Sequence, residues 1–443
     1  MDLVSRYLRP GTLRLGESPP LSLYVHLPWC IAKCPYCDFN SHELAPRMPS
    51  ASAPPGGAPS LGRPGAELAP RMPSASAPRG GAPSVGRPGA VNGGLPEARY
   101  LDALLADLEA ALPQVWGRPV VSVFIGGGTP SLFSPDGIAR LLADIRARLP
   151  LLPGCEITLE ANPGTFERER FKAFRAAGVT RLSVGVQSFD DGMLSKLGRV
   201  HDGAQARAAL TEAAAAFDTF NLDLMYALPG QTLGALQADL DTALGFKPPH
   251  LSIYHLTVEP NTRFAIAPPP GLPDDDLASD MLDLITERTA TAGLQRYEVS
   301  AFARRGHRCQ HNLNYWQFGD YLGIGAGAHG KLSYPHRVIR QVRWRGPESY
   351  MTQALAGQAM SNDDEVARAQ LPFEFMLNTL RLREGFALAD FTARTGLPLS
   401  AIAQPLAAAE AKGLIARDFV RVWPTERGFD FLSDLQALFL PTA

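Results

Sequence analysis

The sequence has few cysteines, no long apolar run and almost no net charge. Its 443 residues include five cysteines, an odd number, and the N-terminus lacks the apolar segment of a secretory signal. Disulfide bonds are therefore not expected, and we expect a reducing, cytoplasmic location. No apolar run reaches the roughly 18 residues of a membrane-spanning helix. With 42 basic and 44 acidic side chains, the formal charge of −2 gives no overall attraction for nucleic acid or an anionic membrane.

Three of the five cysteines lie within one short stretch, HLPWCIAKCPYCDFN, at residues 26–40. Cys30, Cys34 and Cys37 have the spacing C-x3-C-x2-C, which brings three thiolates into one loop. Thiolates are the ligands that iron–sulfur clusters prefer. A cluster of four irons held by three protein sulfurs keeps one iron open to another ligand, so this loop is the predicted centre of the protein's chemistry.

The spacing by itself indicates only a metal site. A structural zinc site takes four closed ligands, and His26 or His42 could complete such a set, so zinc is the alternative. The remaining cysteines, Cys155 and Cys309, are interpreted as buried or surface thiols without a role.

Directly after the cysteines comes a duplicated segment. Residues 43–66 recur as residues 67–90 with 22 of 24 positions identical. The unit is too rich in Pro, Gly, Ala and Ser to bury a core, which predicts a disordered insert without a function. A flap over the cysteine loop is the alternative, because the segment leaves from beside it.

From residue 96 onward, strands and helices alternate. Near-continuous apolar strands with helices between them are typical of parallel sheets covered on both faces, and they favour a β/α barrel or a doubly wound sheet. Polar or unusual residues follow the strand ends, which favours an incomplete (β/α)6 barrel with a site at its mouth. The predicted strands are 21–26, 120–125, 156–160, 181–187, 220–225 and 250–258.

Several of these strand-end residues are candidates for ligand binding. Gly126, Gly127 and Gly128 lack Cβ atoms and let backbone approach a ligand, although a tight turn explains them equally. Glu160 and Asp223 stand where apolar strand residues are expected, so each is either paired with a cation or binds a ligand. Arg199 is a candidate partner, and an internal ion-pair network is the alternative.

The motifs YVHLPWCIAKCPYCDFN, IGGGTPS, LEANPG, SVGVQSF, LGRVH and NLDLMYALPGQ together resemble oxygen-independent coproporphyrinogen dehydrogenase, a radical-SAM enzyme, and more closely its heme-chaperone relatives of the HemW type. The resemblance covers residues 21–42 and 96–443. It implies a [4Fe–4S] cluster on the three cysteines, with S-adenosylmethionine (SAM) on the open iron. It assigns SAM contacts to Tyr24, Gly127, Gly128, Thr129, Glu160, Gln187, Arg199 and Asp223.

Two departures separate the chain from the dehydrogenase. That enzyme has a further cysteine two positions after the third, where this sequence has Phe39, and a longer segment before the first strand. The predicted function is therefore a heme chaperone that binds heme and transfers it to acceptor proteins, with enzymatic activity left open. The alternatives are a radical-SAM oxidoreductase acting on a porphyrinogen, and a cluster-dependent partner-binding module that does not turn over SAM.

A second motif, HNxxYW, points the same way. The resemblance implies that His311, Asn312, Tyr315 and Trp316 bind heme. A neutral imidazole is a good axial ligand to heme iron, and aromatic rings pack on a flat macrocycle. A core histidine among aromatic residues is the alternative. Three nearby arginines are interpreted as an exposed charged strand, with propionate binding as the alternative: Arg340, Arg343 and Arg345.

Beyond residue 363 the chain changes character. Predicted helices at 364–382, 387–395 and 399–412, a strand pair at 414–424 and a helix at 426–439 resemble a winged-helix module. With 8 basic and 11 acidic side chains the module has a net charge of −3, the wrong sign for nucleic acid. Other predicted partners are a reductant protein, a membrane-associated acceptor and a second copy of the chain. The predicted domains are a tail (1–20), the barrel (21–260, with the insert 43–90), a barrel extension (261–362) and the C-terminal module (363–443).

Overall fold

The structure is a computed structural model that describes residues 13–44, 94–164 and 167–441. Of the duplicated segment, only residues 43 and 44 fall within these ranges, so both interpretations of it lie outside the described residues. The described residues from 13 to 44 and from 96 to 441 belong to one compact unit, and the description below is of that unit. No helix in the described ranges is long and apolar enough to cross a membrane.

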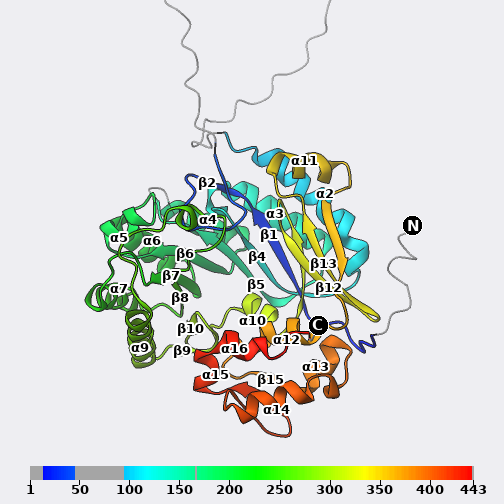
Figure 1. The fold of residues 1–443 in the computed structure, drawn as a ribbon. Helices are drawn as coiled ribbons and strands as arrows, with labels where there is room; N and C mark the ends of the chain where they lie inside the picture. Colours follow the sequence, from blue (N-terminus) through cyan, green and yellow to red (C-terminus); the bar gives the residue numbers. More distant parts are fainter. Residues whose placement is uncertain (1–12, 45–93, 165–166, 442–443) are drawn as a thin grey trace, which may run out of the picture. The chain divides into compact units, whose positions relative to one another are not determined.

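A twelve-stranded sheet forms the frame of this unit (Figure 1). Seven neighbouring strands at its centre are parallel. Antiparallel strands extend it at both edges. In spatial order the strands are β14 (Met360–Glu365), β13 (Arg337–Arg343), β12 (His329–Tyr334), β11 (Asp320–Ile324), β1 (Leu21–Leu27), β4 (Val120–Gly127), β5 (Leu151–Ala161), β6 (Arg181–Gln187), β7 (Phe220–Tyr226), β8 (His250–His255), β10 (Ala301–Ala303) and β9 (Gln295–Arg296).

The predicted fold class, an incomplete β/α barrel, is confirmed. All six predicted strands form, and five of the six central pairs join strands that are consecutive along the chain among the members of this sheet. The sequence prediction missed β11, which pairs in parallel with β1 in the register Leu23↔Leu322. A pairing between segments about 300 residues apart leaves no local pattern, because it depends on the tertiary contact alone.

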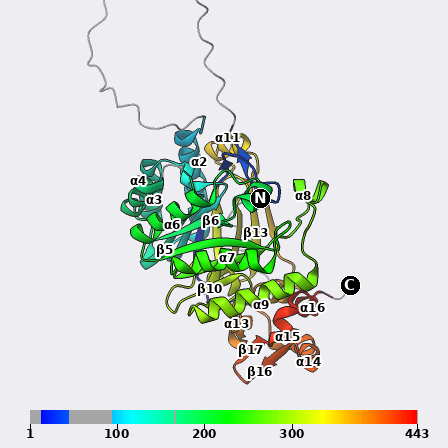
Figure 2. The same cartoon turned by 90° about the vertical axis from the view of Figure 1, so that its left-hand side faces the viewer.

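Helices cover the outer face of the parallel strands (Figure 2). Their sequences contain the start signals that a first turn requires. Ser134 accepts a hydrogen bond from the Gly137 amide at the start of α3, and Asp202 and Gln205 form a reciprocal capping box at the start of α6. The helices of this part are α2 (Glu97–Val115), α3 (Pro135–Arg148), α4 (Glu167–Ala177), α5 (Asp191–Lys196), α6 (Gly203–Ala216), α7 (Leu233–Gly245), α8 (Arg263–Ile266), α9 (Asp275–Thr291), α10 (Gln310–Trp316) and α11 (Pro347–Leu355).

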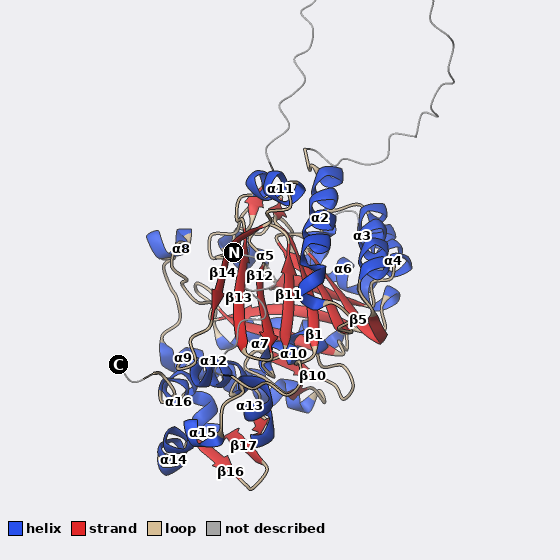
Figure 3. Cartoon of the chain, turned by 90° about the vertical axis from the view of Figure 1, so that its right-hand side faces the viewer, coloured by secondary structure: helices blue, strands red, loops and turns tan. Residues whose placement is uncertain are grey.

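The C-terminal residues form a small α+β module at one end of the strands β11 to β13 (Figure 3). Its apolar cluster includes Phe375 and Phe391, and it also takes in Phe318 from the residues just before β11. Leu13 and Leu15, from the segment predicted as a tail, are buried in the same cluster. The elements are α12 (Leu371–Thr379), β15 (Phe386–Ala387), α13 (Leu388–Thr395), α14 (Ala403–Ala411), β16 (Ile415–Arg417), β17 (Arg421–Pro424), α15 (Glu426–Asp430) and α16 (Leu432–Ala437).

Two predicted helices of this module differ from the structure. The helix expected at 364–382 starts only at Leu371, because residues 360–365 pair as β14 with β13. The helix expected at 426–439 is interrupted at Phe431. Edge strands as polar as MSNDDE lack the apolar alternation from which strands are predicted, so only the tertiary pairing defines β14.

Candidate cofactor-binding site

The cysteine loop begins where β1 ends, at the carboxyl ends of the parallel strands. A short pair, β2 (Trp29–Cys30) with β3 (His42–Glu43), closes the loop. The thiols of Cys30, Cys34 and Cys37 are half-buried. Burial raises the pKa of Cys30 and of Cys37.

Hydrogen-bond donors already face these sulfurs. The Thr129 hydroxyl lies 3.7 Å from the sulfur of Cys30, and Nη1 of Arg199 lies 3.7 Å from that of Cys34. Donors aimed at sulfur stabilise thiolates and tune the potential of an iron–sulfur cluster. The donor set therefore fits the cluster that the spacing predicts.

The two histidines of the zinc alternative differ, because Nε2 of His42 has no hydrogen-bond partner among the described residues whereas His26 is fully bonded. Both ring nitrogens of His26 are engaged, Nδ1 with the Tyr24 hydroxyl at 2.9 Å and Nε2 with the Asn40 carbonyl at 2.9 Å. Among the described residues, no three His, Cys, Asp or Glu side chains gather closely enough to hold a single metal ion. A four-iron cluster distributes its protein sulfurs over three irons, so it suits thiols that are spaced more widely.

The glycine turn after β4 packs directly on the cysteine loop. A Cβ atom at Gly128 would stand 2.5 Å from the Trp29 carbonyl oxygen, and one at Gly127 would stand 2.6 Å from the His26 ring. Gly127 also has φ +120°, which a side chain disfavours. The groups that approach so closely, the Trp29 carbonyl and the His26 ring, belong to the cysteine loop, so these glycines set the position of that loop.

Two half-buried carboxylates, Glu160 on β5 and Asp223 on β7, lie on strands that β6 separates. Burial first, and then the charge of Asp223, raise the pKa of Glu160 to about 7, although the Gly127 amide donates to this carboxylate at 3.0 Å. Burial also raises the pKa of Asp223, against hydrogen bonds from Asn221 and Ser183. Two acids that resist ionisation within electrostatic reach of each other form a site that a cationic ligand would stabilise.

The predicted pairing of Arg199 with Glu160 or Asp223 is wrong. The Arg199 guanidinium donates to the Asn162 side chain and to the Gly185 carbonyl, both at 2.7 Å. Asn162 in turn donates to Thr129 at 2.8 Å. Asn162 thus joins the two residues that face the sulfurs. The sequence analysis missed its role, although it lies within the motif LEANPG.

The remaining strand-end residues reach the same rim. Gln187 ends β6 in the left-handed region, with φ +71°, at a register shift between β6 and β7. Non-glycine residues in this region are costly and collect at functional sites. Tyr24 lies on β1 close enough for the charge of Glu160 to raise its pKa, after burial. The tertiary structure therefore gathers the predicted SAM residues at one end of the strands, around the cysteine loop.

The HNxxYW residues do not share one face. His311 and Tyr315 turn toward β1, β4 and β11, where His311 lies 5.0 Å from the Phe124 ring centroid and Tyr315 4.3 Å from that of Tyr321. Trp316 instead lies beneath the guanidinium of Arg381, 4.2 Å away.

His311 is 1% exposed. Its Nδ1 bonds the Ser122 hydroxyl at 3.0 Å, its Nε2 has no hydrogen-bond partner among the described residues, and burial lowers its pKa to about 3. It is a neutral imidazole with a free nitrogen, enclosed in the barrel.

The interpretation of the three arginines as an exposed charged strand is wrong for two of them. Arg343 is 1% exposed and pairs with the buried Asp107 at 3.1 Å. Arg340 pairs with Glu374 at 2.7 Å and with the Tyr321 hydroxyl at 2.5 Å. These partners already occupy both guanidinium groups. Arg345 alone of the three is exposed.

The comparisons with known proteins agree with this geometry. Residues 24–243 match the radical SAM superfamily, and residues 366–431 match the HemN C-terminal domain. The fold and the site thus define a radical SAM protein.

The chain is 42% identical to heme chaperone HemW of Escherichia coli K12 over 95% of this chain and 98% of that protein, and 41% identical to heme chaperone HemW of Haemophilus influenzae over 96% and 99%. It belongs to the HemW heme chaperone family, so the predicted resemblance is confirmed. The structure of coproporphyrinogen III oxidase (HemN) from Escherichia coli matches over 99% of this chain and 98% of that chain, with TM-score 0.72 and 21% identity, which shows a shared fold.

Proposed function

We propose that this chain is a heme chaperone: it binds heme and transfers it to acceptor proteins, and it holds a [4Fe–4S] cluster on Cys30, Cys34 and Cys37 with SAM at the open iron. The observation that carries the proposal is the near full-length similarity to relatives named heme chaperones. A reductant protein, a membrane-associated acceptor and a second copy of the chain remain predicted partners.

The rim residues have separate tasks in this proposal. Glu160 and Asp223 would attract the cationic groups of SAM, because a positive charge stabilises the ionised form of two half-buried carboxylates. Gly127 and Gly128 would present backbone groups to SAM. Arg199 would orient the sulfur of Cys34, and Thr129 would orient that of Cys30. The cluster with SAM would supply one-electron chemistry at this mouth. The other proposed SAM contacts are Tyr24 and Gln187.

The HNxxYW segment would contribute to heme binding from α10. Its support is chemical: the neutral imidazole of His311 keeps a free nitrogen, and Trp316 stacks under a cation.

The function is tested by heme retention and transfer. Anaerobically purified, cluster-loaded protein mixed with hemin is expected to keep heme through gel filtration and to release it to an apo-heme acceptor, with both steps followed by absorption. A second assay tests the alternative function. The same protein incubated with SAM, reductant and coproporphyrinogen should form no protoporphyrinogen, because Phe39 stands where the dehydrogenase has its further cysteine. Protoporphyrinogen formation without heme retention would support the porphyrinogen oxidoreductase instead.

Affinity for SAM should depend on pH through Glu160. Its pKa of about 7 means that the carboxylate is ionised above neutrality and protonated below it. SAM affinity, measured by equilibrium dialysis on cluster-loaded protein, should therefore fall as the pH decreases from 8 to 6. Glu160→Gln should weaken binding at pH 8 by about tenfold and remove this dependence. The stability of the ligand-free protein has the opposite pH dependence. Because the pKa of Glu160 is raised in the folded state, its contribution to folding stability is lost as the pH rises toward 7, so Glu160→Gln should stabilise the ligand-free protein at pH 8.

A further inference from the structure

Each of the three sulfurs in the cysteine loop faces one side chain that can donate a hydrogen bond. Two of these donors, Thr129 and Arg199, are bonded to the same side chain, that of Asn162. The third donor, Ser41, lies 3.8 Å from the sulfur of Cys37 and forms no hydrogen bond with Asn162. One amide therefore stands behind two of the three donors.

The partners of Asn162 fix the orientation of its amide. A guanidinium group can only donate, so the atom of Asn162 that faces Arg199 at 2.7 Å must be the carbonyl oxygen. The amide nitrogen therefore donates to the hydroxyl oxygen of Thr129, at 2.8 Å. A hydroxyl group that accepts this bond keeps its own proton for another acceptor, and the sulfur of Cys30 lies 3.7 Å away. Arg199, held through Nη2, keeps Nη1 directed at the sulfur of Cys34.

A glycine on the neighbouring strand makes room for this amide. Asn162 follows β5, and a Cβ atom at Gly185 of β6 would stand 2.8 Å from its carbonyl oxygen. The Gly185 carbonyl also accepts from Arg199 at 2.7 Å. Thr129 is fixed to the cysteine loop by its backbone amide, which donates to the Trp29 carbonyl at 2.7 Å. Backbone from three segments thus holds the amide and both of its partners in place.

We infer that Asn162 is a positioning residue: it aims two donors at the cysteine sulfurs and thereby raises the reduction potential of a cluster bound there. Hydrogen bonds to the ligand sulfurs favour the reduced cluster, because that form carries more negative charge. The inference rests on the proposed [4Fe–4S] cluster and names a residue that adjusts its potential through two others. A residue that only supported the turn after β5 would affect stability and leave the potential unchanged.

The test is a redox titration of the full-length, cluster-loaded protein without SAM, followed by electron paramagnetic resonance. Asn162→Ala should lower the reduction potential. At the wild-type midpoint the ratio of reduced to oxidised cluster should fall about tenfold, which corresponds to about 59 mV for a one-electron couple. Iron and sulfide analysis of each sample measures loading, so that only loaded protein is compared.

Two double-mutant cycles test whether Asn162 acts through its partners. Thr129→Val removes the hydroxyl group with little change of shape, so the potential shift of Asn162→Ala with Thr129→Val should be smaller than the sum of the single shifts. Ser41→Ala removes the independent donor, and its shift should add to that of Asn162→Ala. If the alanine variant does not hold the cluster, Asn162→Asp repeats the first cycle. An aspartate keeps the size of the side chain and accepts from Arg199, but it cannot donate to Thr129.

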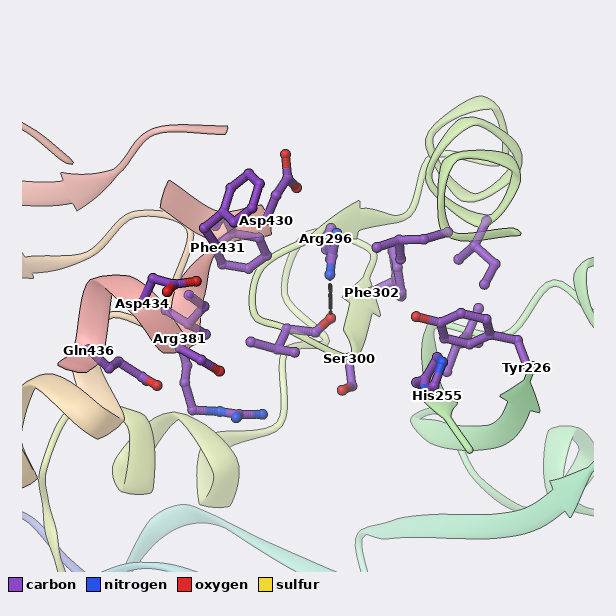
Figure 4. Close-up of a pocket in the computed structure, with 17 residues that line it drawn as sticks. Tyr226, His255, Arg296, Ser300, Phe302, Arg381, Asp430, Phe431, Asp434 and Gln436 are labelled. Atoms are coloured by element: carbon purple, nitrogen blue, oxygen red, sulfur yellow. Dashed lines mark hydrogen bonds between the residues drawn. The ribbon is translucent and has the colours of Figure 1, made fainter. Parts of the chain in front are cut away.

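Gln436→Ala is the matched control for the loss of a side-chain amide. Figure 4 shows Gln436 at the cavity of about 490 Å³ between the sheet and the C-terminal module, where its amide donates to the Leu377 carbonyl at 2.9 Å. Its replacement should leave the potential unchanged.

The outcomes separate this inference from the proposed function. If the wild type holds no iron and sulfide after anaerobic reconstitution, the proposed cluster and the function built on it are overturned. If the wild type is loaded but Asn162→Ala keeps the wild-type potential, or if its shift adds fully to that of Thr129→Val, the role of Asn162 is wrong and the function stands.

Discussion

Replacing Cys34 with serine is expected to abolish cluster binding, and with it SAM binding and heme transfer. Three thiolates are the minimum that the cubane needs here, and serine oxygen is a poor ligand for iron in such clusters. The fold should survive, because Arg199 keeps its bonds to Asn162 and Gly185 when the sulfur is lost. Iron and sulfide analysis after anaerobic reconstitution, with circular dichroism for the fold, measures both parts of the prediction.

Cys155→Ser is the matched control for this experiment. Cys155 is also half-buried but lies on β5, outside the cysteine loop. Its replacement should leave iron content unchanged. Equal iron loss in the two variants, or full iron content in Cys34→Ser, would contradict the assignment of the loop as the cluster site.

Replacing Arg343 with leucine is expected to destabilise the protein by about 3–5 kcal/mol, because the variant leaves the Asp107 carboxylate buried and without its cation. The two side chains are 1% and 2% exposed and meet at 3.1 Å. Asp107 would keep hydrogen bonds from the Tyr350 hydroxyl and the Gly325 amide, which cannot neutralise the charge. Chemical denaturation of wild type and variant under the same conditions gives the difference in unfolding free energy.

The same substitution should reduce cluster uptake, since this ion pair supports the cysteine loop. Asp107 and Tyr350 hold the turn at Gly325, and the neighbouring Ala326 carbonyl accepts from Asn40 at the end of the loop, at 2.9 Å. The double variant Asp107→Asn with Arg343→Leu should recover most of the lost stability, because no uncompensated charge remains.

An exposed ion pair provides the control. Arg99 and Glu348 are 45% and 72% exposed, so Arg99→Leu should change stability by less than about 1 kcal/mol. A loss of similar size in both single variants would show that burial does not decide the strength of the pair.

Much of the site could be predicted because its signals are local. The spacing of the three cysteines brings the thiols into one loop whatever surrounds it. Strand-end positions such as Glu160 and Asp223 meet because the carboxyl ends of parallel strands share one rim. The partners of these residues could not be predicted in the same way. Arg199 bonds Asn162 and not a carboxylate, because the ends of β5 and β6 place Asn162 and the Gly185 carbonyl beside it.

The interpretations that failed concern residues whose partners are distant along the chain. The local sequence around Arg343 predicts an exposed charged strand, yet Asp107 on α2, more than 200 residues earlier, pairs with it in the buried interior. β14 is polar throughout and becomes a strand only because β13 offers a free edge.

The sequence by itself determined the three sulfurs, the rhythm of strands and helices, and hence the barrel and its functional rim, because spacing and periodicity depend on residues close together along the chain. Only the tertiary structure decided which charges are paired and which histidine is enclosed. Those properties depend on burial and on partners from remote segments, and no local pattern encodes either.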